Sequence, residues 1–294
     1  MATRATVPPA PHIEQGGPEI SVRAICWALL RTDGTIHLAE VADIATALGL
    51  SEQTVRHGVR RLCDREGFTR EGRGRRAIAR TGPHSTDLWD LDRELVRFAY
   101  RQDAGDEPWD GHWRLVTFSI PEPRRADRDR LRAWLRAMGG APVSHATYVS
   151  PHDWWDVVHP TVEELDLTAH VTWGELDRLV VAGLDEPTAI AAHLWPRTER
   201  DLAYAAALVK IEDANQAWNQ LDSPARRRAW VAATVAITPP LDADPLLPTE
   251  LASSSGLSTR QAYRALTERF LTDVEGADHY SVAVEMTQAA RREP

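Results

Sequence analysis

The chain has 294 residues, of which 43% are hydrophobic and 26% are charged, so it can form two or three domains with buried cores. It contains no run of about 20 apolar residues, which excludes a membrane-spanning helix. Its first residues also lack the apolar segment of a signal peptide, and we therefore expect a cytoplasmic protein. The formal net charge of −9 argues against a protein that coats nucleic acid with its whole surface.

The positive charge is concentrated near the start of the chain. Residues 51–80 contain nine arginines and four acidic residues, a net charge of +5, whereas the remainder is acidic. A local basic surface on an acidic body is typical of a DNA-binding regulator. The basic surface meets phosphate, and the acidic body limits non-specific binding.

Two helices are predicted after a disordered tail over residues 1–18, which are rich in proline, alanine and glycine. Residues 20–31 and 38–48 carry apolar side chains at helical spacing. Cys26 and Cys63 both fall in helical apolar patterns, so we expect two reduced cysteines rather than a disulfide.

A third helix is predicted after a turn. Gly49 suits the end of the preceding helix, because glycine adopts a positive φ without strain, and Ser51 is a good N-cap. Val55, Val59 and Leu62 form one apolar stripe, which leaves polar and basic side chains on the remaining surface. An apolar back and a front with Arg and Gln are what the recognition helix of a helix-turn-helix requires. The alternative interpretation is an Arg-rich face that is simply solvated.

A short hairpin is expected over residues 67–81. Its tip, residues 72–76, is rich in glycine and arginine and can reach backbone phosphate or a minor groove. Three helices followed by a basic hairpin are the elements of a winged helix, which we predict over residues 19–84. The candidate DNA-binding residues are four that would read bases (Gln53, Thr54, Arg56 and His57) and five that would mainly hold phosphate (Arg60, Arg61, Arg73, Arg75 and Arg76).

The segment 85–109 is predicted to be a linker helix, because Leu88, Leu91, Leu95 and Phe98 recur about every 3.5 residues. Such a helix is either a connector that packs on the domain that follows or part of a dimer interface. The two interpretations remain open.

A small ferredoxin-like α+β domain is predicted over residues 110–185, because strands and helices alternate there. The strands are expected at 110–122, 146–151, 169–173 and 179–183, and the helices at 124–140 and 162–166.

A mainly helical domain is predicted over residues 186–294, with a break at Thr238-Pro239-Pro240. Within it, residues 249–284 repeat the pattern of the N-terminal helix-turn-helix, and 278–284 would be the wing. The net charge of −1 over residues 249–292 favours a degenerate helix-turn-helix or plain packing over DNA contact. The expected fold class is thus a multidomain α+β protein.

Three ordered blocks of the chain carry a resemblance to a known family. The first is Leu48-Gly49-Leu50-Ser51 with Val55-Arg56, Arg60-Arg61-Leu62 and residues 72–76. The second is residues 113–122 with Arg128, Leu131, Arg132, Leu135, Gly139 and Tyr148-Val149-Ser150-Pro151. The third is Asp244-Pro245-Leu246-Leu247-Pro248. In this order the blocks resemble the PaaX family, the bacterial transcriptional repressors of the phenylacetic acid degradation operon type.

The resemblance implies a repressor that binds operator DNA as a homodimer and is released by an acyl-CoA effector. The operator would then be an inverted repeat. Tryptophans could line a pocket for an aromatic acyl group, or they could fill a core. Arginines at the start of the central helix could hold coenzyme A phosphates, or they could be a solvated face. The candidate effector-binding residues are Trp113, Arg124, Arg125, Arg128, Trp154 and Trp155.

Two other functions were considered. The central domain also resembles the small CRISPR adaptation nuclease, which carries an Asp just after its first strand. Ser119 occupies that position here and cannot hold a divalent metal as a carboxylate does, which disfavours a metal-dependent nucleic-acid-processing enzyme. A protein-interaction adaptor that has lost DNA binding is the third alternative. No histidine or cysteine spacing matches a zinc site, so we predict neither a metal, a cofactor nor an enzymatic activity.

Overall fold

The computed structural model describes residues 21–252 and 256–289, so the predicted disordered tail over residues 1–18 lies outside the described part. Contacts divide the chain into two compact units, each assembled from separate segments. One lies within residues 102–200 and 242–255, and the other within 16–101, 201–241 and 256–294. This grouping does not follow the consecutive segments expected from the sequence, because helices from both ends of the chain share one core.

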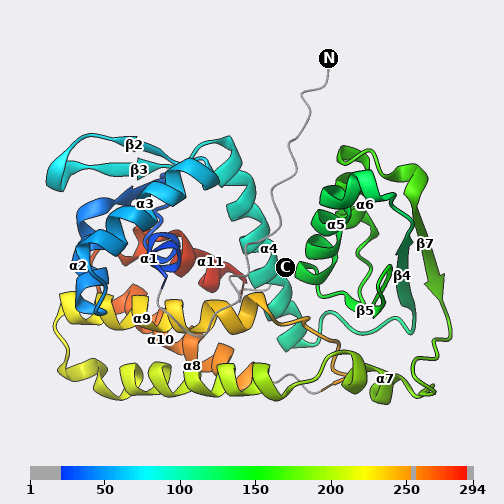
Figure 1. Ribbon diagram of the computed structural model, residues 1–294. Coiled ribbons are helices and arrows are strands. Elements are labelled where there is room, and N and C mark those ends of the chain that lie inside the picture. Colours follow the sequence, from blue (N-terminus) through cyan, green and yellow to red (C-terminus); the bar gives the residue numbers. More distant parts are fainter. Residues whose placement is uncertain (1–20, 253–255, 290–294) are drawn as a thin grey trace. The chain divides into compact units, whose positions relative to one another are not determined.

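The helical unit begins with three helices and a small antiparallel sheet, and β3 is the central strand between β1 and β2. Figure 1 shows the β2–β3 hairpin on the side of this unit that is remote from α8. The strand before the second helix was not expected, since a three-residue strand leaves almost no pattern in the sequence. The elements are α1 (Val22–Ala28), β1 (Thr35–His37), α2 (Leu38–Ala47), α3 (Glu52–Glu66), β2 (Thr69–Glu71) and β3 (Ile78–Arg80).

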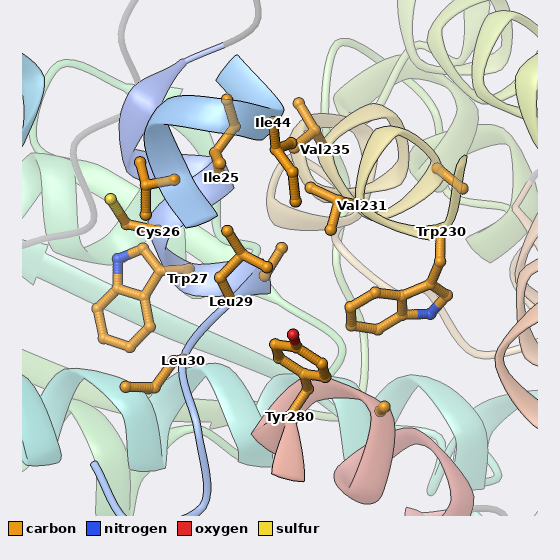
Figure 2. Close-up of a cluster of buried hydrophobic side chains, with 14 of the residues drawn as sticks. Ile25, Cys26, Trp27, Leu29, Leu30, Ile44, Trp230, Val231, Val235 and Tyr280 are labelled. Carbon is orange, nitrogen blue, oxygen red and sulfur yellow. The ribbon is translucent and has the colours of Figure 1, made fainter. Parts of the chain in front are cut away.

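Helices from later in the chain complete the helical unit. The side chains of α1 pack in one cluster with those of the C-terminal helices, and Figure 2 shows Ile25 and Leu29 beside Val231, Val235 and Tyr280. Burial raises the pKa of the Cys26 thiol in this cluster, and both cysteines are free, as predicted. The helices are α4 (Pro83–Ala104), α8 (Thr198–Ala217), α9 (Ser223–Asp242), α10 (Leu257–Asp273) and α11 (Ser281–Ala289).

Two predictions for the C-terminal helices were wrong. Helix α9 continues through Pro239 and Pro240, which lie in its last turn, and the Thr238 hydroxyl donates to the Thr234 carbonyl at 2.8 Å. Residues 281–289 form α11 rather than the strand of a second wing, and their buried apolar residues, Ala283 and Met286, lie three positions apart on one helix face.

The second unit contains a four-stranded antiparallel sheet with the strand order β5-β6-β4-β7. Its elements follow the order strand, helix, strand, strand, helix, strand, which is the order of the ferredoxin-like motif. The chain reverses at the predicted strand over residues 179–183, because Ala182 and Gly183 both have positive φ, so that prediction was wrong. The elements are β4 (Trp113–Phe118), α5 (Arg125–Ala137), β5 (Ala141–Ser144), β6 (Thr147–Ser150), α6 (Trp155–Glu164), β7 (Val171–Leu176) and α7 (Pro187–Leu194).

The two faces of this sheet are covered by different segments. Val116 and Phe118 of β4 pack in one cluster with α5 and α6, whereas Trp113 packs in another with α7 and Leu247. The segment that contains Leu247 is the Asp-Pro-x-Leu-Pro block, and the Pro245 carbonyl oxygen lies 2.9 Å from Nε2 of the half-buried His152. The third block that resembles the PaaX family therefore packs on the second. Across the described residues, no helix has the length and apolar character needed to cross a membrane.

Candidate nucleic-acid interface

The turn before α3 has the local structure that its sequence predicts. Gly49 has a φ of 87°, and the backbone N–H of Leu50 donates to the Ala45 carbonyl at 2.9 Å. The Ser51 hydroxyl accepts from the Thr54 N–H at 3.1 Å, which satisfies one of the free donors at the helix start. The helix ends at Gly67, whose φ of 73° is left-handed. Both ends of α3 are thus fixed by local chemistry.

The apolar stripe of α3 is buried. Val55, Val59 and Leu62 are at most 8% exposed and belong to the same core cluster as α1. Glu66, in the last turn, fixes the other end of the α1–α3 contact. Its carboxylate accepts from Arg23 Nε at 2.8 Å and from Trp27 Nε1 at 2.9 Å. Because one carboxylate holds two side chains of α1, the orientation of α3 on α1 is well defined.

The remaining face of α3 is exposed and carries all six predicted residues of this helix. Arg56 lies 4.0 Å from Glu52 and Arg60 lies 3.4 Å from Asp64, in ion pairs whose side chains are all at least 63% exposed. Pairs this exposed contribute at most about 1 kcal/mol and are screened by salt. Both guanidinium groups can therefore exchange a carboxylate for a phosphate. The exposed residues are Gln53, Thr54, Arg56, His57, Arg60 and Arg61.

The hairpin that follows α3 presents a second basic surface. Gly72 and Gly74 have φ of 74° and 60° and form its tip. Arg73 and Arg76 are exposed there, while the side chain of Arg75 is outside the described part of the structure. Arg70 on β2 is also exposed, and it was not among the predicted DNA-binding residues. Its place opposite the buried Ala79 of β3 depends on strand register, which the sequence alone did not fix.

The predicted effector-binding tryptophans lie in two different places. Trp113 is buried and stacks on Trp195 at 6.3 Å between ring centroids. Trp154 is buried with the α5 and α6 side chains, and half-buried Trp155 lies beside Trp173, 4.8 Å between centroids. Since Trp113 belongs to the cluster on the other sheet face, the structure does not bring the three rings into one pocket.

The predicted effector-binding arginines are held by protein groups. Arg124 donates to the carbonyls of Leu165 and Asp166 at the end of α6. Arg128 lies 3.1 Å from Glu122, and Arg125 is 70% exposed and 4.0 Å from the same residue. Arg124 thus satisfies the C-terminal carbonyls of a helix, a structural role that explains its position without a ligand.

The second helix-turn-helix pattern corresponds to a helix used for packing. In α10, Thr259, Arg260 and Tyr263 are at most 2% exposed. The Arg260 guanidinium donates to the Tyr204 hydroxyl at 3.1 Å. Residues that would face DNA in a recognition helix therefore face the protein interior here.

The position that a nuclease would use has no cluster of acidic side chains among the described residues. Ser119 follows β4, and its backbone N–H donates to the His170 carbonyl at 2.8 Å. Glu122, three residues further on, is paired with Arg128. Among the residues that the structure describes, no group of three or more His, Cys, Asp or Glu side chains could hold a metal ion.

Comparison with known proteins bears on the central domain. Residues 106–188 match a family model described as the PaaX protein central Cas2-like domain. The match covers the central part of the chain, so this domain is similar to the central domain of PaaX proteins. No curated protein matches the chain. A solved structure of the uncharacterized protein Rv0674 from Mycobacterium tuberculosis is similar over 93% of this chain and 100% of its own, with 19% identity and a TM-score of 0.48.

Proposed function

We propose that the chain is a DNA-binding transcriptional regulator whose reading head is a winged helix-turn-helix formed by α1, α2, α3 and the β2–β3 hairpin. The observation that carries this proposal is α3, whose polar and basic face is exposed while its apolar stripe is held against α1. A major groove admits a helix, and Arg and Gln side chains recognise guanine and adenine edges there. The similarity of the central domain to that of PaaX proteins supports a role in transcription regulation.

The roles of the basic residues follow from their positions. Residues in the first two turns of α3 would read base edges, as the N-terminal part of a recognition helix does. The later arginines of α3 and those of the hairpin would hold phosphate, which gives affinity without sequence preference. The base-reading residues are Gln53, Thr54, Arg56 and His57, and the phosphate-binding residues are Arg60, Arg61, Arg73, Arg75 and Arg76, to which we add Arg70.

The finer proposal is a homodimeric repressor that is released by an acyl-CoA thioester of the aryl-acetyl type. It rests on the family resemblance. Two recognition helices would enter successive major grooves about 34 Å apart, so the operator would be an inverted repeat. A thermal shift assay against a panel of acyl-CoA thioesters tests the effector, since a ligand of the native state raises the melting midpoint. If no thioester raises the melting midpoint, the proposal of an acyl-CoA effector is wrong, and the DNA-binding proposal is unaffected.

DNA binding is tested by fluorescence anisotropy, with a duplex from the region upstream of the gene and a random duplex of equal length. We expect Arg56→Ala to weaken binding to the upstream duplex about 5- to 100-fold and to affect the random duplex much less. Arg76→Ala should weaken both to a similar extent and reduce the salt slope by about 1, because it removes a phosphate contact.

The matched control is Arg264→Ala, which removes one exposed positive charge from α10. This variant should bind both duplexes like the wild type. Two results would show that net charge rather than α3 governs binding. One is that Arg56→Ala weakens binding to both duplexes equally, and the other is that Arg264→Ala weakens binding as much as Arg56→Ala does. A wild-type protein that does not distinguish the two duplexes would also contradict the proposal.

A further inference from the structure

A groove lies between α5 and the β5–β6 hairpin, all within the sheet-containing unit. Arg132 and Arg136 of α5 line one side, and Val143, His145 and Tyr148 of the hairpin line the other. None of these residues belongs to the candidate DNA interface or to the effector-binding residues predicted from the sequence. The groove is therefore a separate feature that needs its own explanation.

Two guanidinium groups give the groove its charge. Arg136 lies over the Tyr148 ring at 5.8 Å from its centroid, and it has no carboxylate partner among the described residues. Arg132 is held in place because it donates twice to the His145 carbonyl, at 2.6 and 3.1 Å. Asp129 is the acidic residue of the lining, and its charge is countered by Arg132 at 3.4 Å and by Arg125 at 3.6 Å. The groove thus retains an excess of positive charge, with one cation available to a ligand.

The hairpin side of the groove carries exposed apolar groups. Val143 is 39% exposed, and Pro142 beside it is also exposed. An exposed aliphatic group opposite a free guanidinium suits a ligand that has both an apolar part and a negative charge. Pockets for small molecules commonly combine apolar walls with a few polar groups that fix orientation.

An added peptide strand is disfavoured, although β5 is an edge strand of the sheet. Pro142 has no N–H to donate, and the register of β5 on β6 shifts between Pro142 and Ser144. Proline and bulges are features by which edge strands avoid pairing with another chain. The groove is therefore better suited to a small molecule than to a peptide or to the edge of a second sheet.

We propose that this groove binds a small organic anion, a phosphate ester or carboxylate that carries an aromatic or apolar group. The negative group pairs with Arg136, and a guanidinium can form two parallel hydrogen bonds to either oxyanion. The apolar group lies against Val143 and Pro142. The proposal does not depend on DNA binding, because binding of the anion is measured with the protein alone.

The test is isothermal titration calorimetry with phenyl phosphate and benzoate as probes, beside inorganic phosphate and phenol. We expect at least one of the two aromatic anions to bind. Inorganic phosphate and phenol should bind at least about tenfold more weakly, because the first lacks the apolar group and the second lacks the negative charge. Whichever aromatic anion binds more tightly identifies the anionic group. If neither binds, or if inorganic phosphate binds as tightly as phenyl phosphate, the proposal is wrong.

Two variants locate the site. Arg136→Gln should weaken binding of the aromatic anion about tenfold or more, because a charge-assisted bond is lost. Val143→Asp should abolish binding, since it places a like charge on the exposed apolar wall, and its thermal midpoint should match the wild type. The matched control is Arg130→Gln, which removes an arginine of the same helix that pairs with Glu164 and does not line the groove. Equal weakening by Arg130→Gln and Arg136→Gln would overturn the assignment.

Discussion

Gly58 sets how closely two helices approach in the proposed reading head. A Cβ built on Gly58 of α3 would lie 2.4 Å from Val22 Cβ and 2.7 Å from its Cγ1. Val22 is a 5% exposed residue of α1, so it has little room to move. The missing side chain therefore allows the backbone of α3 to lie against α1, which fixes where the exposed face of α3 points.

We predict that Gly58→Ala destabilises the protein by about 1 to 3 kcal/mol, the usual cost of overpacking a core. The sign of this change is informative, because a Gly→Ala substitution inside a helix otherwise raises the free energy of unfolding by about 1 kcal/mol. Urea unfolding measures the free energy of unfolding of both proteins. His57→Ala, at the exposed neighbouring position, should change it by less than about 0.5 kcal/mol. A Gly58→Ala protein as stable as the wild type would mean that α1 and α3 are not in close contact.

At the scale of elements, α10 shows how a sequence pattern can be shared by helices with different roles. Its Gly-Leu-Ser turn and its Arg and Gln residues resemble those of α3, yet Arg260 is 1% exposed and bonded to Tyr204. By contrast, Arg264, one turn later, is 42% exposed and pairs with Glu268 at 3.0 Å. The two arginines therefore provide a matched pair on one helix.

We predict that Arg260→Ala lowers the free energy of unfolding by about 3 kcal/mol or more, because it opens a cavity and leaves buried polar partners unpaired. Arg264→Ala should cost less than about 0.5 kcal/mol. Urea unfolding gives both values, and DNA binding of each folded variant should be unchanged. If Arg260→Ala leaves stability intact and weakens DNA binding instead, α10 is a second recognition helix rather than a packing helix.

Local patterns were sufficient for α3 and insufficient for several other segments. The spacing of Val55, Val59 and Leu62 specifies which face of a helix is buried, so the exposed side chains could be named before the structure was known. The run at residues 179–183 is as apolar as a strand, but positive φ at Ala182 turns the chain. An apolar run alone does not determine whether the backbone stays extended.

The groove on α5 could not have been predicted from sequence for a related reason. In the sequence, Arg132 and Arg136 are two of several arginines in the segment that forms α5. What distinguishes them from Arg124 and Arg125 is that β5 and β6 lie beside them, and β5 itself was not predicted. A short edge strand that contains Pro142 gives no alternating pattern, so the position of this hairpin depends on long-range packing.

At the scale of the whole molecule, the proposed reading head shares its core with the C-terminal helices. Glu40 of α2 accepts a hydrogen bond from the Tyr280 hydroxyl, which is distant in sequence. Glu40 also lies 3.3 Å from Arg31 and 3.5 Å from Arg227, and its side chain is only 16% exposed. Burial and the neighbouring Glu40 carboxylate raise the pKa of Tyr280, so its hydroxyl remains a donor even at a pH where a free tyrosine ionises.

We predict that α2 and the C-terminal helices unfold together and that Glu40 and Tyr280 are energetically coupled. Glu40→Gln and Tyr280→Phe should each cost about 1 to 3 kcal/mol, because each leaves a partly buried charged or polar partner without its bond. The double variant should cost less than the sum, by about 0.5 to 3 kcal/mol, whereas Glu40→Gln with Arg264→Ala should be additive. Urea unfolding, followed by tryptophan fluorescence and circular dichroism, measures all the variants. Strict additivity for Glu40 and Tyr280 would mean that this contact contributes no coupling.

The core that α1–α3 share with the C-terminal helices predicts a single unfolding transition. A separate early transition for α1–α3 would mean that these helices fold without the C-terminal helices.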